Sequence, residues 1–186
     1  MTFTELVTEI LLITKRPDWD ARARSALRAQ TLLWHRTDKY WADLATVPVT
    51  GLTSDFTQAL DIATWFPNFR QLASVESCDI VQFGDLLDEN GFERTNIALM
   101  AGTSLNIKRN VEITSVTVTY FRDPVVSPEN LYSSWIADRF PDLLINASAL
   151  DLLGKQNETE IAQFCRVQVA AQAQSLKMCS IEGQGR

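Results

Sequence analysis

His35 is the only histidine among the 186 residues, so it is the one imidazole that could act as a general acid or base near neutral pH. A histidine that serves as the base for nucleophilic catalysis needs a Ser or Cys nucleophile beside it. No such residue stands in a recognisable motif around His35. A single histidine also excludes metal sites built from two or more imidazoles. Because His35 follows Trp34 inside a segment of helical pattern, we interpret it as a structural residue.

Phosphate and metal sites are not indicated either. The seven glycines form neither a Walker loop nor the glycine-rich motifs of dinucleotide-binding and hydrolase folds. The acidic segment 85–91 has some likeness to a calcium loop but lacks alternate carboxylates and a closing Glu. Asp138 and Asp142 flank Phe140 and Pro141, where carboxylates are typical of helix caps. The sequence therefore predicts no catalytic residue, no cofactor and no metal, and we expect the chain not to be an enzyme.

The three cysteines, Cys78, Cys165 and Cys179, are odd in number and include no C-x-x-C pair. Glu5 and Glu9 interrupt the first apolar segment and no basic stretch precedes it, so we expect no secretory signal peptide. Free thiols in a reducing compartment follow from these two observations. No apolar run approaches the roughly 20 residues of a membrane span, and no membrane partner is expected.

Charge is segregated along the chain. The total is −6, from 17 Lys and Arg against 23 Asp and Glu. Residues 15–39 carry a net charge of +4, residues 43–93 carry −8 and residues 123–160 carry −5. A chain with a pI near 4.8 and no basic tail is a poor candidate for free-standing binding to nucleic acid.

Two helices are predicted at the N-terminus. Thr2 and Glu5 form a capping box that opens the first helix, and Pro17 ends it. The second helix is predicted from a cap at Asp18 to about Leu44, and a short turn between the two favours antiparallel packing. The apolar stripe of this second helix is expected to consist of Ala23, Ala26, Leu27, Gln30, Leu33, Trp34, Trp41 and Leu44.

The middle of the chain has the alternation of β-strands, and helices return at its end. Residues 97–99 and 105–107 face each other across a Gly-containing turn, which predicts a hairpin. A helix is predicted from Pro128 to Phe140, a second one closes at Gly154, and a third follows. Asn157 is expected to cap this last helix. Its inward residues are expected to be Ile161, Phe164, Cys165, Ala171 and Leu176.

These patterns predict an α+β protein in which the N- and C-terminal helices form an antiparallel helical bundle around a central antiparallel β insertion. The predicted parts are an N-terminal helix pair (1–44), a β-rich insertion (45–126), and C-terminal helices with a short tail (127–186). Together they are expected to form one compact domain with an inserted β subdomain.

The order of pieces in the C-terminal half is similar to that of a known family. A strand over 115–124 leads into Ser-Pro-Glu-Asn at 127–130, and a helix ends at Phe-Pro-Asp-Leu-Leu over 140–144. Ala-Ser-Ala-Leu at 147–150, a polar gap and a long final helix follow. With the two N-terminal helices, this order resembles the tailed-bacteriophage head-to-tail connectors, also called adaptor or head-completion proteins.

The resemblance implies a structural role in the virion. Such proteins form a ring, usually a dodecamer, beneath the portal protein, and they join it to the tail or nozzle protein. They surround the genomic DNA in the channel without sequence-specific binding, and they are generally not enzymes. The implied location is the head–tail neck of the virion, after synthesis in the host cytoplasm. The C-terminal segment is implied to contact the portal, through Lys177, Met178, Ser180, Ile181 and Arg186.

Three other functions stay open on the sequence alone. The first is another virion part of similar outline, such as a tail-completion or tail-terminator protein. The second is a small enzyme of unrecognised class, against which the missing nucleophile–histidine motif counts. The third is a host-derived interaction module.

Overall fold

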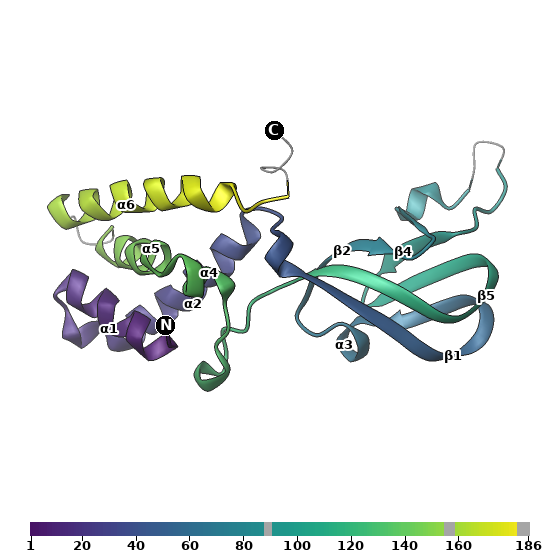
Figure 1. Ribbon diagram of the computed structural model, residues 1–186, viewed down its shortest axis with the longest axis horizontal. Helices are drawn as coiled ribbons and strands as arrows, with labels where there is room; N and C mark the ends of the chain where they lie inside the picture. The colour runs from purple at the N-terminus through teal and green to yellow at the C-terminus, as the bar shows by residue number, and fades with distance from the viewer. Residues whose placement is uncertain (88–90, 155–158, 182–186) are drawn as a thin grey trace. The chain divides into compact units, whose positions relative to one another are not determined.

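The computed structural model describes residues 1–87, 91–154 and 159–181. The chain divides into two compact units (Figure 1). Met1–Asp43 and Asp123–Arg186 form the first, which we call the helical unit, and Leu44–Arg122 form the second, which we call the β unit. Each unit has its own cluster of buried apolar side chains.

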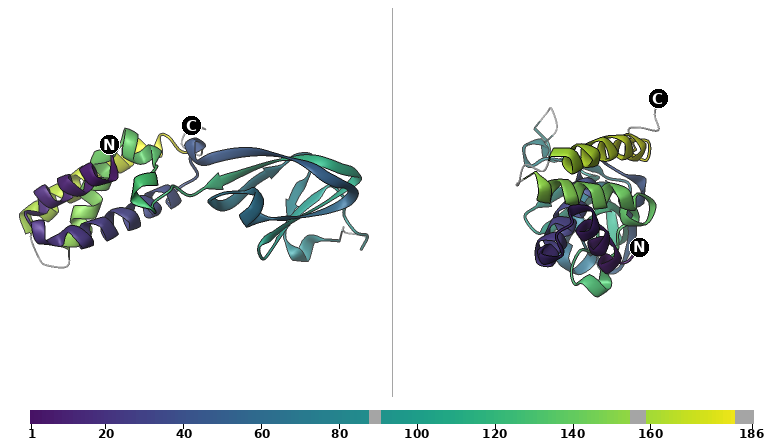
Figure 2. Two further views of the ribbon diagram at one scale, coloured as in Figure 1. Left: turned by 90° about the horizontal axis from the view of Figure 1, so that it is seen from below. Right: turned by 90° about the vertical axis from the view of Figure 1, so that its left-hand side faces the viewer.

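The helical unit is layered. Its helices are α1 (Phe3–Thr14), α2 (Asp20–Arg36), α4 (Trp135–Arg139), α5 (Pro141–Leu153) and α6 (Thr159–Lys177). In Figure 1 and in the right-hand view of Figure 2, α5 lies between α6 on one side and α1 and α2 on the other. The predicted capping box is present, because the Thr2 side chain accepts from the Glu5 N–H and the Glu5 carboxylate accepts from the Thr2 N–H.

The predicted antiparallel helical bundle was wrong. A bundle helix buries one stripe of its surface, whereas every residue from 143 to 149 of α5 is buried. α5 is therefore a central element, and α1, α2 and α6 each pack on it. α1 and α2 make less contact with each other than either makes with α5.

Two predicted helices are shorter than expected. α2 ends at Arg36, not near Leu44, and a 3₁₀ turn at Trp41–Asp43 leads into β1. Leu33, expected on the buried stripe, is exposed, and Leu27 is fully buried. The helix expected from Pro128 to Phe140 is a 3₁₀ turn at Glu129–Leu131 followed by α4.

The β unit is a five-stranded mixed sheet. Its elements are β1 (Leu44–Asp61), α3 (Ile62–Trp65), β2 (Phe69–Val75), β3 (Asp79–Val81), β4 (Ile97–Ala101) and β5 (Ser104–Arg122). β5 pairs antiparallel with β1, β2 and β4, and β4 pairs parallel with β3. The predicted hairpin is confirmed as β4–β5, with Gly102 at a φ of 60° in its turn. The expectation of a purely antiparallel insertion was wrong, because β3 returns to β4 through a connection long enough for parallel pairing.

Candidate functional site

A buried polar cluster of the helical unit has the atoms of a serine–histidine–carboxylate triad. His35 Nδ1 lies 2.8 Å from Asp43 Oδ1, and His35 Nε2 lies 2.9 Å from Ser134 Oγ. These are the nitrogens that bind the carboxylate and the hydroxyl in serine hydrolases. The sequence does not reveal this cluster, because Ser134 is 99 residues from His35 and stands in no nucleophile motif.

Three separate elements position the cluster. His35 lies in the last turn of α2, Asp43 ends the 3₁₀ turn before β1, and Ser134 is the N-cap of α4. The indole Nε1 of Trp135 donates to the same Asp43 oxygen at 2.7 Å. The Trp135 ring packs edge-on against His35 and Phe140, with ring centroids 5.7 and 6.4 Å away.

The three residues of this cluster are buried, and the serine hydroxyl already takes part in capping a helix. The exposed fractions of His35, Asp43 and Ser134 are only 1%, 2% and 4%. Ser134 Oγ already accepts from the Ala137 N–H as the cap of α4. Described cavities of about 550, 460 and 410 Å³ are lined by other residues. We therefore interpret the cluster as a polar core that fixes α2, the turn before β1 and α4 to one another.

The residues expected to contact the portal lie in two environments. Lys177, the last residue of α6, and Met178 are exposed. Ser180 is buried and forms an antiparallel bridge with Tyr40, and the Ile181 N–H donates to the Lys39 carbonyl at 2.8 Å. The structure therefore attaches Ser180 and Ile181 to the segment after α2. Arg186 lies outside the described residues, as does the predicted cap Asn157.

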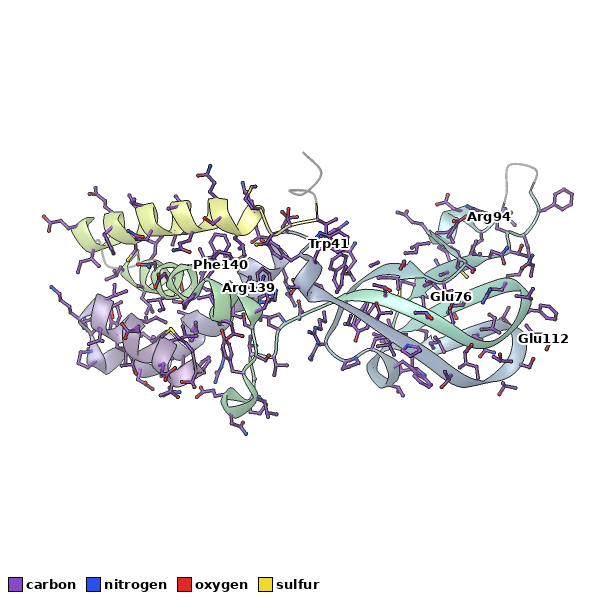
Figure 3. All side chains as sticks on the ribbon, viewed as in Figure 1. Trp41, Glu76, Arg94, Glu112, Arg139 and Phe140 are labelled. Carbon is purple, nitrogen blue, oxygen red and sulfur yellow. The ribbon has the colours of Figure 1, made fainter. Side chains whose placement is uncertain are left out.

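The outward side of α6 carries apolar side chains, and the sequence had placed two of them, Phe164 and Ala171, inside. Phe164, Val167 and Met178 have exposed fractions of 56%, 65% and 68%, and Ala171 is exposed as well. Figure 3 shows side chains along α6 directed away from α5. The buried side of α6 includes Ala162, Cys165 and Leu176. The sequence signal for the outward stripe is its spacing, since positions 164, 167, 171 and 178 recur at the intervals of one helix face.

The β unit has a second group of exposed apolar side chains. Phe83, Leu87 and Phe92 are all more than half exposed, in the connection between β3 and β4. The neighbouring cavity of about 460 Å³ is also lined by Arg94 and Lys108. Large contiguous apolar patches mark contact surfaces for other macromolecules, whereas single exposed apolar side chains are normal on a protein surface.

Charged side chains elsewhere hold loops in place. The Glu129 carboxylate accepts from Arg24 and Arg28 of α2 at 2.5 Å each, which fixes the 3₁₀ turn against that helix. The carboxylate of Asp123 pairs with Arg36. These ion pairs account for part of the basic charge of residues 15–39 within the helical unit itself.

No described helix has both the length and the apolar character to cross a membrane. Across residues 1–87, 91–154 and 159–181, no group of three or more His, Cys, Asp or Glu side chains is arranged to hold a metal ion. Comparison of the chain with protein-family models gave no match, and comparison with curated proteins gave none either.

Proposed function

We propose that this protein is a structural component of a phage virion, a ring-forming head-to-tail connector that joins the portal to the tail and lines the DNA channel. The observation that carries the proposal is the placement of large exposed apolar side chains on both units, on α6 and in the β3–β4 connection. A connector needs separate contact surfaces for the portal, the tail and its own neighbours in the ring. A monomeric enzyme needs only one concave site.

The two separate cores support this role. The helical unit and the β unit each have a continuous buried cluster, led by α5 residues in one and by β5 residues in the other. Each unit can therefore present a contact surface from its own rigid framework. The resemblance in the order of strands, helices and the Phe-Pro-Asp-Leu-Leu segment points to the same family of proteins.

Net charge also supports the role. The chain carries −6, and a ring of such chains adds the charges of all its copies. DNA phosphates are repelled by an acidic wall, so genomic DNA would pass through the channel without binding to it. The single triad-like cluster is buried and its serine is occupied as a helix cap, which favours a structural role over hydrolysis.

The test is reconstitution with the portal of the same phage. Purified protein is mixed with portal rings, and the complex is examined by negative-stain microscopy and native mass spectrometry. The expected result is a second ring on one end of the portal, with a copy number that matches ring symmetry. Failure to bind the portal at micromolar concentration, with binding to tail tubes instead, would favour the tail-completion or tail-terminator alternative. Binding to neither would refute a virion connector.

A further inference from the structure

We infer that the last turn of α2 controls how freely the β unit moves, because it binds both chain connections between the helical unit and the β unit. The ion pair between Arg36 and Asp123, which we call the latch, restrains the second connection while it is formed and releases it when it breaks. The inference does not depend on the connector role, since the contacts that carry it lie within the helical unit.

The chain passes between the two units twice. The first connection leaves the helical unit at Asp43 and enters β1 at Leu44, and the second leaves β5 at Arg122 and re-enters the helical unit at Asp123. Leu44 pairs with Phe121 at the end of the antiparallel β1–β5 ladder, so the two connections lie side by side where the β unit begins. A group that holds both connections therefore limits the movement of the β unit.

Adjacent residues of α2 hold the two connections. The carboxylate of Asp43, the last residue before β1, lies 2.8 Å from His35 Nδ1. The carboxylate of Asp123, the first residue after β5, accepts from both Nε and Nη2 of Arg36, the last residue of α2. Two parallel bonds from one guanidinium fix the orientation of a carboxylate as well as its distance. Each connection is therefore bound to α2 at the residue where it meets the β unit.

The two contacts differ in their access to solvent. His35 and Asp43 are only 1% and 2% exposed. The Arg36 side chain is 55% exposed, and that of Asp123 is 18% exposed. Salt screens an ion pair at the surface far more than a buried one, and a surface pair contributes little to stability. The latch can therefore break and re-form while the buried contact stays intact.

The latch acts on a short span of chain. Beyond Asp123 the next contact is an antiparallel bridge, in which Val125 and Ser133 exchange two backbone hydrogen bonds of 3.1 and 2.9 Å. When the contact with Arg36 breaks, Asp123 and Pro124 are released between this bridge and β5. Protein hinges are a few residues at the ends of elements, and this span has that length and position. Its release loosens the connection without unfolding the helical unit.

Distance measurements between the units test the latch. Spin labels are attached at Thr8→Cys on α1 and Val111→Cys on β5, both exposed, in a parent chain with Cys78 and Cys179 replaced by serine. Double electron–electron resonance then gives the distribution of distances between the labels. Arg36→Gln should broaden this distribution about twofold or more, because the released span no longer restrains the β unit. Salt at about 1 M should broaden the parent in the same way and leave Arg36→Gln unchanged, since it screens the exposed pair.

The matched control is Arg28→Gln. This variant removes an ion pair of the same helix whose partner, Glu129, belongs to neither connection, so the distribution should keep the width of the parent. Exchanging the charges, as Arg36→Asp with Asp123→Arg, should restore the narrow distribution that Arg36→Asp alone loses. Thermal melts check that every variant remains folded, and the salt measurement on the parent needs no substitution in the latch.

Three results would overturn the inference. A parent chain as broad as Arg36→Gln would show that the pair restrains nothing. Equal narrow distributions in the parent, in Arg36→Gln and at high salt would show that the connection is held without the pair. Equal broadening in Arg28→Gln would trace the effect to general loosening of α2. None of these results concerns portal binding, so the connector role is tested separately.

Discussion

Replacing Asp43 with alanine is expected to destabilise the helical unit more than the loss of most polar side chains. One oxygen of this carboxylate accepts both from His35 Nδ1 and from the Trp135 indole N–H. Asp43→Ala removes that acceptor and leaves two donors in a region from which water is largely excluded. The cost arises mainly from the two orphaned donors, because a buried polar group that loses its partner keeps its desolvation penalty.

The magnitude follows from the number and burial of those donors. Each buried donor that loses its partner costs about 1–3 kcal/mol. The His35 ring is 1% exposed and belongs at the upper end of this range, whereas Trp135 is only half-buried and belongs at the lower end. The expected loss is therefore about 3–4 kcal/mol in the free energy of unfolding. For a unit of about 100 residues, this lowers the melting temperature by roughly 12 °C or more.

The assay is urea and thermal unfolding followed by circular dichroism at the helix band. Asp43→Asn is the informative companion, because its amide oxygen keeps two lone pairs for the same donors but carries no negative charge, and it should lose less stability than Asp43→Ala. Asp18→Ala, at an exposed carboxylate, is the control and should change stability by less than about 0.5 kcal/mol. If Asp43→Ala unfolds within about 0.5 kcal/mol of the wild type, the cluster does not contribute to the stability of the unit and the reasoning is wrong.

Three further outcomes are expected. In native protein at pH 8, Cys165 should react with a thiol reagent far more slowly than Cys78, because Cys165 is fully buried and Cys78 only partly, while burial raises the pKa of both thiols; equal rates would contradict the packing of α6 on α5. Truncation after residue 179 should lower the melting temperature, since it removes the Ser180 and Ile181 contacts to the segment after α2, and an unchanged melt would show that the chain end is free. Hydrogen bonds from the capping box hold the pKa of Glu5 below its ordinary value of 4.5. The contribution of Glu5 to stability is therefore present above pH 4.5 and lost as the pH falls through the folded pKa. Glu5→Gln should remove this part of the acid sensitivity in pH-dependent melts, and an acid profile identical to that of the wild type would contradict the reasoning.

Local signals were sufficient for several elements. The Thr2–Glu5 capping box, the end of α5 at Gly154 and the β4–β5 hairpin each depend on residues within a few positions of one another. Such features are visible in sequence because their hydrogen bonds are short in range. The α+β composition follows from them, but the arrangement of the helices does not.

Long-range contacts explain what the sequence did not show. The second helix was predicted to continue to about Leu44. It ends at Arg36, and the chain turns so that the Asp43 carboxylate accepts hydrogen bonds from His35 and Trp135. Ser134, predicted inside a helix, instead begins one, since its hydroxyl caps α4 and meets the same histidine. These partners are 8 to 99 residues apart in sequence, and no local spacing indicates them.

α6 shows most clearly why the amino-acid sequence alone does not determine which apolar residues are buried. The sequence gives α6 apolar residues on two sides, and only tertiary packing selects Cys165 and Leu176 over Phe164 and Val167 for the core. In α5, by contrast, residues 143–149 are all buried, including the polar Asn146 and Ser148.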